Sequence, residues 1–440
     1  MNKIKQSILK YNGVNYLVPF ILITSCFALW GFANDITNPM VKAFSKIFNM
    51  SVTEGALVQV AFYGGYFAMA FPAAMFIRRF SYKAGILMGL GLYAMGALLF
   101  FPAKMTGNYY PFLLAYFILT CGLSFLETSA NPYILAMGSP ETATRRLNMA
   151  QAFNPMGSLL GMYVAMSFIQ AKLNPADSAE RAQLSEVAFE EMKQSDLSVL
   201  IGPYLIIGLV IVAMFLLIWW MKMPKVQENS KQDGLLPTLR RIFAQKRYRN
   251  GVIAQFAYVG AQIMCWTFII HYGTHVLTDE GMEVQAAEVL SQRYNIIAMV
   301  IFCSSRFICT FLLKYINAGR LLAILAIAAS CFTACVIGID GRWGLYALVA
   351  VSACMSLMFP TIYGIALEGM GEDAKFGAAG LIMAILGGSV LPPVQALIID
   401  QGDEILGWPA VNWSFILPLM CFLVVMYYGF STAREDKQRA

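Results

Sequence analysis

Long apolar segments alternate with short polar connections along most of the chain. About twelve of these segments have roughly 20 residues, the length that an α-helix needs to cross a hydrocarbon core of about 30 Å. The pattern therefore predicts an all-α membrane protein with twelve transmembrane helices. The approximate centres of the predicted helices are Thr24, Tyr66, Leu92, Leu119, Ser158, Val210, Ala261, Ile301, Ile327, Ala350, Ile385 and Leu419.

The composition excludes the obvious alternative, a large soluble protein with buried core helices. Of the 440 residues, 59% are hydrophobic and only 13% are charged, whereas a soluble domain carries about 25% charged residues. Too little polar surface would remain to cover such a core. We therefore expect a multi-pass integral membrane protein that contacts the lipid bilayer.

The apolar pattern is interrupted once, near the middle of the chain. This interruption predicts a six-helix half at 1–222, a cytoplasmic linker at 223–249 and a second six-helix half at 250–440. Residues 27–31 resemble residues 256–260 at an offset of about 230 residues, which favours an internal duplication. Two related halves would place a substrate site between them at the middle of the membrane.

Basic residues indicate the orientation, because Lys and Arg are retained on the cytoplasmic side of a membrane. Most of them fall in the connections that share a side with the amino terminus, so we expect both termini to be cytoplasmic. This topology also accounts for most of the net charge of +6, and we infer no nucleic-acid partner.

One carboxylate, Glu127, lies inside a predicted transmembrane helix. A charge at the centre of such a helix costs roughly 2.5 to 3.5 kcal/mol, so it usually faces a cavity and has a function. Polar side chains at helical spacing form stripes on the first, fourth, fifth and seventh helices. The residues that we expect to bind substrate are Asn38, Asn131, Gln151, Asn154, Tyr258, Gln262, Trp266 and Phe359. The alternative for each amide is a hydrogen bond that joins two helices within the membrane.

Amides, a carboxylate and aromatic rings together suit a polyhydroxylated ligand. The amides and the carboxylate match neighbouring hydroxyl groups, and aromatic faces cover apolar CH patches. We find no nucleophile–base pair, so we do not expect an enzyme. All nine cysteines lie in apolar segments without a CxxC motif, and no ligand set for a metal appears. We expect no metal and no cofactor, and a neutral sugar is the simplest substrate.

The chain also resembles a known family, the L-fucose:proton symporters of the major facilitator superfamily. The resemblance covers nearly the whole chain through FALWGFAN (27–34), QVAFYGGYF (59–67), SYKAGI (81–86), LETSANP (126–132), RLNMAQAFNPMG (146–157) and QFAYVGAQIMCW (255–266). It implies the superfamily fold, proton coupling, a deoxyhexose or hexose as substrate, and a bacterial inner membrane as the location.

In that family, the LET-ANP glutamate and an aspartate of the first helix are the key acidic residues. Glu127 matches the glutamate. Asn38 occupies the position of the aspartate, whereas Asp35, the carboxylate of this first helix, lies three residues earlier, or about 300° of helical rotation. The resemblance therefore implies Glu127 as a proton-coupling residue, with Asp35 as the candidate for the second acid.

The expected function is proton-coupled import of a neutral monosaccharide, L-fucose or a related hexose, by alternating access in a monomer. Three alternatives remain open at this point. Loss of proton coupling would leave a hexose uniporter or a sodium-coupled sugar carrier. A proton-coupled drug exporter would share the fold, with a more apolar cavity and fewer amides. The residues do not decide which sugar is carried.

Overall fold

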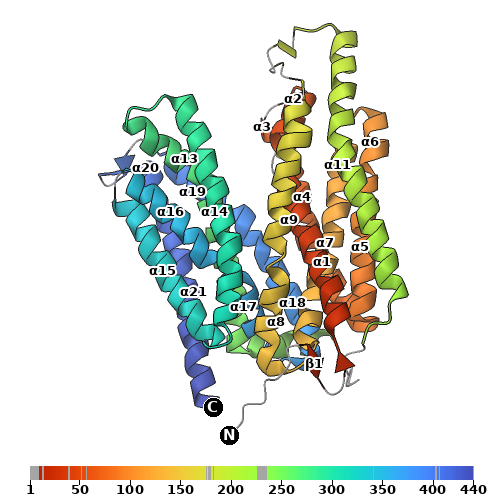
Figure 1. Ribbon diagram of the computed structural model, residues 1–440, viewed down its shortest axis with the longest axis vertical. Coiled ribbons are helices and arrows are strands. Elements are labelled where there is room, and N and C mark those ends of the chain that lie inside the picture. Colours follow the sequence, from red (N-terminus) through yellow and green to blue (C-terminus); the bar gives the residue numbers. More distant parts are fainter. Residues whose placement is uncertain are drawn as a thin grey trace. The chain divides into compact units, whose positions relative to one another are not determined.

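The structure is a computed structural model that describes residues 9–11, 14–37, 40–50, 52–55, 57–174, 176, 180–181, 183–224, 235–339, 341–401, 404–405 and 407–439. These residues are nearly all helical (Figure 1). Twelve helical segments, from Leu17–Thr37 to Ala410–Gln438, are long and apolar enough to cross a membrane. Helices dominate because a spanning segment must satisfy its backbone hydrogen bonds internally. The prediction of twelve transmembrane helices is confirmed.

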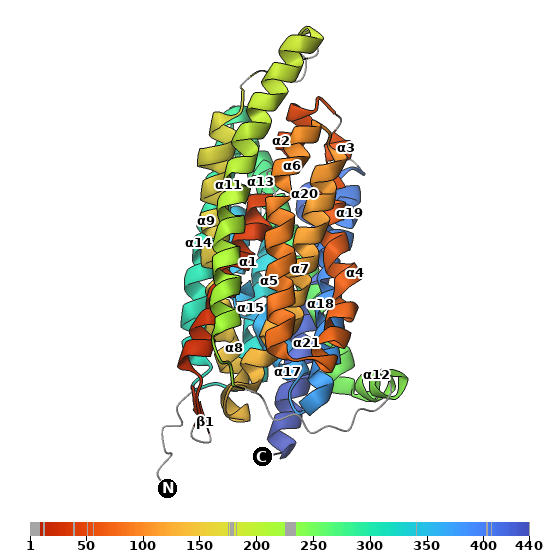
Figure 2. The ribbon, with the colours of Figure 1, turned by 90° about the vertical axis from the view of Figure 1, so that its right-hand side faces the viewer.

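The helices divide into two compact units, and the first contains residues 1–137 and 153–227. In unit 1, α7 packs between α4 and α5, α11 packs on α5, and α1 packs on α9 (Figure 2). Its elements are β1 (Lys10–Tyr11), β2 (Val14–Asn15), α1 (Leu17–Thr37), α2 (Met40–Ile47), α3 (Val52–Gly55), α4 (Leu57–Arg79), α5 (Tyr82–Leu98), α6 (Phe100–Thr106), α7 (Tyr110–Ala136), α9 (Asn154–Val164), a π-helical turn (Ala165–Ile169), a 3-10 turn (Gln170–Lys172) and α11 (Glu186–Trp220).

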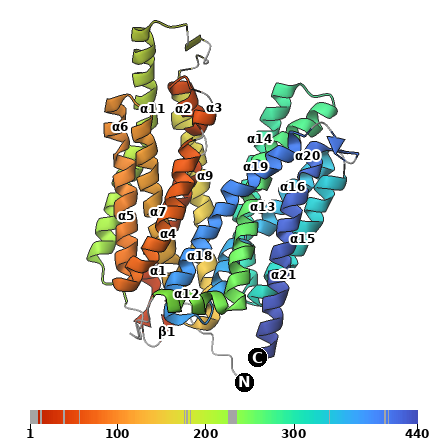
Figure 3. The ribbon, with the colours of Figure 1, turned by 180° about the vertical axis from the view of Figure 1, so that it is seen from behind.

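The second unit contains residues 138–152 and 228–440. In unit 2, α13 lies against α14, α19 and α21, while α15 packs between α16 and α21 (Figure 3). Its helices are α8 (Ala143–Gln151), α12 (Leu235–Ala244), α13 (Lys246–Asp279), α14 (Val284–Leu312), α15 (Ala318–Gly338), α16 (Arg342–Met355), α17 (Met358–Ala366), α18 (Ala374–Met383), α19 (Gly387–Ile399), α20 (Ala410–Trp413) and α21 (Ile416–Arg439). Short 3-10 turns lie at Pro140–Thr142, Gly371–Asp373 and Ala384–Leu386, and the strands are β3 (Glu404–Ile405) and β4 (Trp408–Pro409).

Both strand pairs are antiparallel hairpins of two residues per strand. Lys10 lies opposite Asn15 in the first, and Glu404 lies opposite Pro409 in the second. Such short ladders contribute little to stability on their own. The apolar helices therefore form the framework of each unit.

Helix α8 belongs to unit 2 by its packing. The Asn148 amide donates to the Thr361 hydroxyl on α17 at 3.2 Å, and Nη1 of Arg306 on α14 donates to the Gln151 carbonyl at 3.0 Å. These contacts explain why residues 138–152 group with the later helices, although they precede α9 in the chain. The division into halves at 1–222 and 250–440, with a linker at 223–249, stays a prediction.

Glycines bring α1 and α9 into direct backbone contact. A Cβ atom added to Gly157 would lie 1.8 Å from the Ala28 carbonyl oxygen, and one added to Gly31 would lie 2.0 Å from the Asn154 carbonyl oxygen. Both distances are far below any real van der Waals contact. Small residues permit this close approach, which replaces the hydrophobic effect as a source of helix association in lipid.

The same contact recurs in unit 2, between α13 and α19. A Cβ atom added to Gly387 would lie 2.2 Å from the Phe256 carbonyl oxygen. Phe256 follows Ala28 by 228 residues, and Gly387 follows Gly157 by 230, close to the offset at which the sequence resembles itself. Corresponding helices therefore use the same kind of backbone contact in each unit.

We expect Gly157→Ala to destabilise the protein by about 1 to 3 kcal/mol, since the new methyl group meets backbone that cannot rotate away. Thermal unfolding in detergent measures this as a lower midpoint. Gly64→Ala is the control, because a Cβ atom on Gly64 meets nothing within 4 Å. Equal midpoints for the two variants would contradict the packing described.

An ion pair holds the segment that precedes α11. Nη2 of Arg181 lies 2.6 Å from Oδ2 of Asp196, and the side chains are 0% and 2% exposed. Oδ1 of Asp196 accepts the Asn174 backbone N–H at 2.8 Å, and Nε of Arg181 donates to the Ala176 carbonyl at 3.1 Å. Because both charges are buried, each depends on the other for compensation.

Candidate functional site

Glu127 lies in the interior of unit 1, on the central helix α7. Its side chain is 1% exposed. Neither carboxylate oxygen has a hydrogen-bond partner of normal geometry within the described part of the chain, and no ion pair includes Glu127 there. Burial with so little compensation is costly for an ionised carboxylate. The position is therefore suited to a group that binds and releases a proton.

Tyr66 on α4 is the polar neighbour of this acid. Its hydroxyl group interacts with Glu127 and with the Trp30 indole, and it donates a long hydrogen bond to Oδ1 of Asn34 at 3.5 Å. The Ser124 hydroxyl, one turn before Glu127, donates to the Tyr66 carbonyl at 3.1 Å. Three helices, α1, α4 and α7, thus converge on the carboxyl group. We call Trp30, Asn34, Tyr66 and Glu127 the acid cluster.

The other acidic and amide candidates of unit 1 lie around this cluster. Asp35 is half-buried on α1 and close enough to Tyr63 to interact with it electrostatically. Asn131 is fully buried one turn after Glu127 on α7. Asn38, at the position of the family's aspartate, lies outside the described residues. The structure therefore places one of the two predicted acids in the interior and the other at a more accessible position.

Asn154 uses its amide group to join helices. Nδ2 of Asn154 donates to the Phe27 carbonyl at 3.3 Å, and the Ser158 hydroxyl donates to the Gly31 carbonyl at 3.3 Å. Both bonds cross the contact between α9 and α1. For Asn154 the structure thus shows an interhelical hydrogen bond, which was the alternative to substrate binding.

Unit 2 gathers the aromatic candidates on α13 and its neighbours. The Tyr258 hydroxyl donates to the Met355 carbonyl at 3.0 Å, and the Trp266 indole N–H donates to the Ser352 hydroxyl at 3.2 Å. Phe359 is half-buried, with its ring centre 6.4 Å from that of Tyr258. The polar atoms of Tyr258 and Trp266 are therefore bound within the protein. Tyr258 is fully buried, whereas Trp266 is half-buried and keeps part of its ring exposed.

The two glutamine candidates differ in their surroundings. Gln262 is half-buried on α13, and its amide makes no hydrogen bond to the described residues. Gln151 is 3% exposed at the end of α8, where its backbone carbonyl accepts a hydrogen bond from Arg306.

Arg306 also donates through Nε to the Ser356 carbonyl at 2.5 Å, and its guanidinium lies over the Phe302 ring at 4.6 Å. This guanidinium joins α8 and α14 to the junction of α16 and α17.

Tyr66 is a functional candidate that the sequence alone did not indicate. An aromatic residue in an apolar helix is far more often part of the packing than part of a site, so its type gave no signal. Helical spacing orders residues on one helix, whereas the acid cluster assembles from three. The segment QVAFYGGYF, which carries Tyr66, entered only as part of the family resemblance.

Comparison with known proteins gives consistent matches. The family model described as Major Facilitator Superfamily matches residues 23–390. The chain is 53% identical to the L-fucose-proton symporter of Haemophilus influenzae, over 94% of this chain and 96% of that protein. It is 30% identical to the glucose/galactose transporter of Brucella abortus, over 94% of each. The crystal structure of the transporter FucP in the outward conformation superposes with a TM-score of 0.85 at 32% identity, covering 95% of this chain and 99% of that one.

The described residues contain twelve helices that can span a membrane, and unit 1 contains a buried acid. Together with these matches, they define a multi-pass membrane transporter rather than an enzyme, situated in a bacterial inner membrane. The chain belongs to the major facilitator superfamily, and within it to the family of the L-fucose:proton symporters. The resemblance seen in the sequence motifs is thereby confirmed.

Proposed function

We propose that this protein imports L-fucose together with a proton, by alternating access. The observation that carries the proposal is the 53% identity, over 94% of the chain, to a symporter named for these two substrates. The buried acid supports it, since no cation among the described residues pairs with Glu127 to hold it in the ionised form. A more distant relative, at 30% identity, is named for glucose and galactose, so the hexoses are the natural competitors in a test.

In this mechanism, Glu127 carries the proton and the other members of the acid cluster position it. After the proton leaves, the Tyr66 hydroxyl turns from its long hydrogen bond with Asn34 and donates to the carboxylate instead. Opening to each side of the membrane in turn exposes the acid to each compartment. A carboxyl group that loses its proton on one side and regains it on the other couples sugar movement to the proton gradient.

The sugar contacts amide groups and aromatic rings in this proposal. Gln262 offers its amide, Asn131 lies next to the acid, and Trp266 and Phe359 present ring faces to the CH patches of a hexose. Asp35 is the second acid in this proposal and takes the role of the carboxylate that is absent at Asn38. Gln151, Asn154 and Tyr258 shape the site through the hydrogen bonds and packing described above.

Two further features belong to the proposal. Both termini lie in the cytoplasm, as the distribution of Lys and Arg favours. The proposed functional form is a monomer.

Uptake by purified protein in vesicles tests the proposal. Labelled L-fucose, D-galactose and D-glucose are compared with an inward proton gradient, with a sodium gradient, and with neither. The expected result is accumulation of L-fucose above equilibrium only with the proton gradient. Equilibration without accumulation would indicate a uniporter, and accumulation driven by sodium would indicate a sodium-coupled carrier. Preference for either hexose would overturn the assignment of L-fucose.

A further inference from the structure

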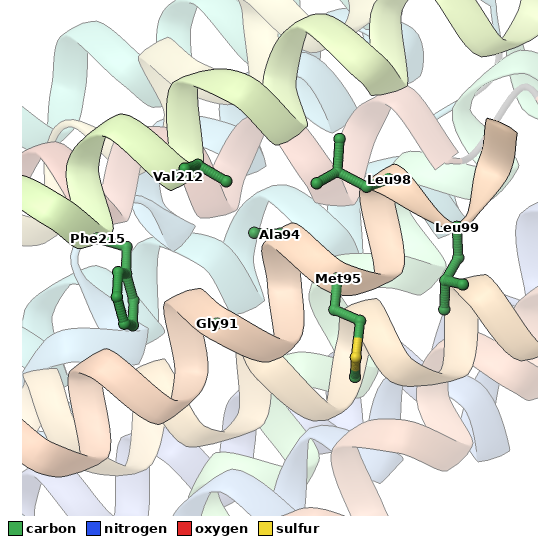
Figure 4. A pocket seen from close by; sticks show the side chains of 7 residues that line it. All are labelled: Gly91, Ala94, Met95, Leu98, Leu99, Val212 and Phe215. Atoms are coloured by element: carbon green, nitrogen blue, oxygen red, sulfur yellow. The ribbon is translucent and has the colours of Figure 1, made fainter.

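The outer surface of unit 1 carries an apolar groove between α5 and α11 (Figure 4). It is lined by Gly91, Ala94, Met95 and Leu98 of α5 and by Val212 and Phe215 of α11, with a volume of about 450 Å³. That volume falls within the range of about 300 to 1,000 Å³ that is usual for small-ligand sites. Met95, which lines the groove, and Leu216, which follows the lining residue Phe215, are about half exposed, at 45% and 51%. The groove therefore opens towards the hydrocarbon of the bilayer.

The groove exists because Gly91 has no side chain. Three other glycines of α5 are required by close packing, since an added Cβ atom would lie within 2.8 Å of a neighbour at Gly85, Gly89 and Gly96. At Gly91 the added atom would meet, among the described residues, the Phe215 ring alone, at an ordinary contact distance of 3.8 Å. Glycine in a helix interior costs roughly 0.5 to 1 kcal/mol relative to alanine. Packing within the described part of the chain does not require this glycine, whereas a ligand in the groove would.

One end of this helix pair is basic and aromatic. Nζ of Lys83, at the start of α5, donates to the Trp219 and Met221 carbonyls at 2.9 and 2.6 Å. Lys222 follows directly and is exposed, while Trp219 and Trp220 are 64% and 87% exposed. Trp is enriched at the membrane–water interface. An ammonium group has three donors, so Lys83 keeps one for a further partner.

The distance along α5 from the basic end to the groove matches the depth to which one acyl chain of a lipid reaches into the bilayer. Gly91 lies eight residues beyond Lys83 and Leu98 lies fifteen beyond it, or about 12 and 22 Å along the helix. A hydrocarbon core of about 30 Å has its middle within this range. A chain that starts at a headgroup beside Lys83 would thus run along the groove to the middle of the bilayer.

We propose that the α5–α11 groove binds one acyl chain of an anionic phospholipid whose phosphate lies at Lys83 and Lys222. An acyl chain gains little from apolar contact alone, because surrounding lipid tails are equally apolar. Selectivity therefore comes from the headgroup, since basic pockets between transmembrane helices bind anionic lipid headgroups. This site is independent of the sugar and proton pathway and does not rest on the proposed function.

Native mass spectrometry of the whole protein with phosphatidylglycerol or phosphatidylethanolamine tests the inference. We expect the unmodified protein to retain phosphatidylglycerol preferentially. Gly91→Leu, which fills the groove, should reduce its occupancy about tenfold. Lys222→Gln, which leaves the Lys83 contacts intact, should reduce it about fivefold. The matched control is Ile206→Phe, which adds bulk to α11 at a side chain that is 67% exposed and outside the groove.

Each other outcome overturns the proposal. Equal retention of phosphatidylglycerol by Gly91→Leu and the control would exclude the groove as the site. Equal binding of both lipids, with no effect of Lys222→Gln, would exclude headgroup selection. A dimer that forms in detergent and dissociates in Gly91→Leu would show that a second copy of the chain occupies the groove. Thermal unfolding midpoints verify that all three variants are folded.

Discussion

Replacing Glu127 by Gln is expected to abolish accumulation of sugar against its gradient. A proton that moves inward releases about 2.3 kcal/mol per 100 mV, enough to concentrate a neutral solute about fifty-fold at one-to-one coupling. Gln has nearly the shape of a protonated Glu but exchanges no proton. Accumulation should therefore fall from about fifty-fold to none at 100 mV, while exchange of labelled for unlabelled sugar continues. Vesicles with an imposed potential and pH gradient provide both measurements.

The control for this variant is Glu191→Gln, on the exposed beginning of α11. It removes the same charge from a residue in contact with water, so accumulation should remain at the unmodified level. Accumulation that persists in Glu127→Gln would assign proton coupling to another residue, with Asp35 as the next to test. If Glu127→Gln loses both accumulation and exchange but unfolds at the same temperature as the unmodified protein, Glu127 would be assigned to sugar binding instead.

Replacing Asp196 by Ala is expected to lower the free energy of unfolding by about 3 to 5 kcal/mol, the cost of leaving a buried charge uncompensated. Among the described residues, the Arg181 guanidinium would keep its bonds to the Ala176 and Asn174 carbonyls, and the Asn174 N–H would lose its acceptor. Asn174 and Arg181 should then detach from α11. Thermal unfolding in detergent and the rate of proteolysis within residues 172–185 measure the two effects.

A second ion pair on the same helix supplies the comparison. Nζ of Lys193 lies 2.5 Å from Oε2 of Glu190, but Glu190 is half exposed. Exposed pairs contribute about 0 to 1 kcal/mol, so Glu190→Gln, at the exposed partner, should change the unfolding midpoint little. If Asp196→Ala were as mild as Glu190→Gln, the burial of the Arg181 pair would not be the source of its contribution.

The twelve helices could be predicted because their lengths and compositions are dictated by the bilayer. The positions at which a helix breaks within a membrane span could not be predicted. The fifth span ends one helix at Gln151 and starts another at Asn154, and the eleventh passes through a 3-10 turn at Ala384–Leu386. Mean hydropathy records only that each span is apolar enough to cross a membrane. Where a helix breaks depends on its neighbours, such as the contact of Asn148 with Thr361.

The candidate site could be predicted in part for a similar reason. A carboxylate in a long apolar segment is conspicuous, so Glu127 was found from its type alone. The amide of Asn154, the hydroxyl of Tyr258 and the indole of Trp266 are capable of binding either a sugar or a neighbouring helix. The structure gives all three a partner within the protein. Tyr66 was missed because its role comes from three helices that only folding brings together.

The direct backbone contacts also limit how each unit can change shape. Side-chain interfaces adjust in small steps as rotamers change, but Gly157 against Ala28 has no rotamers to adjust. The same is true of Gly387 against Phe256. Each of these helix pairs should therefore move as a rigid body, without translation or rotation of one helix against the other. Conformational change during the transport cycle would be confined to helices that meet through longer side chains. Spectroscopic probes placed on the two helices of each pair should report a constant separation.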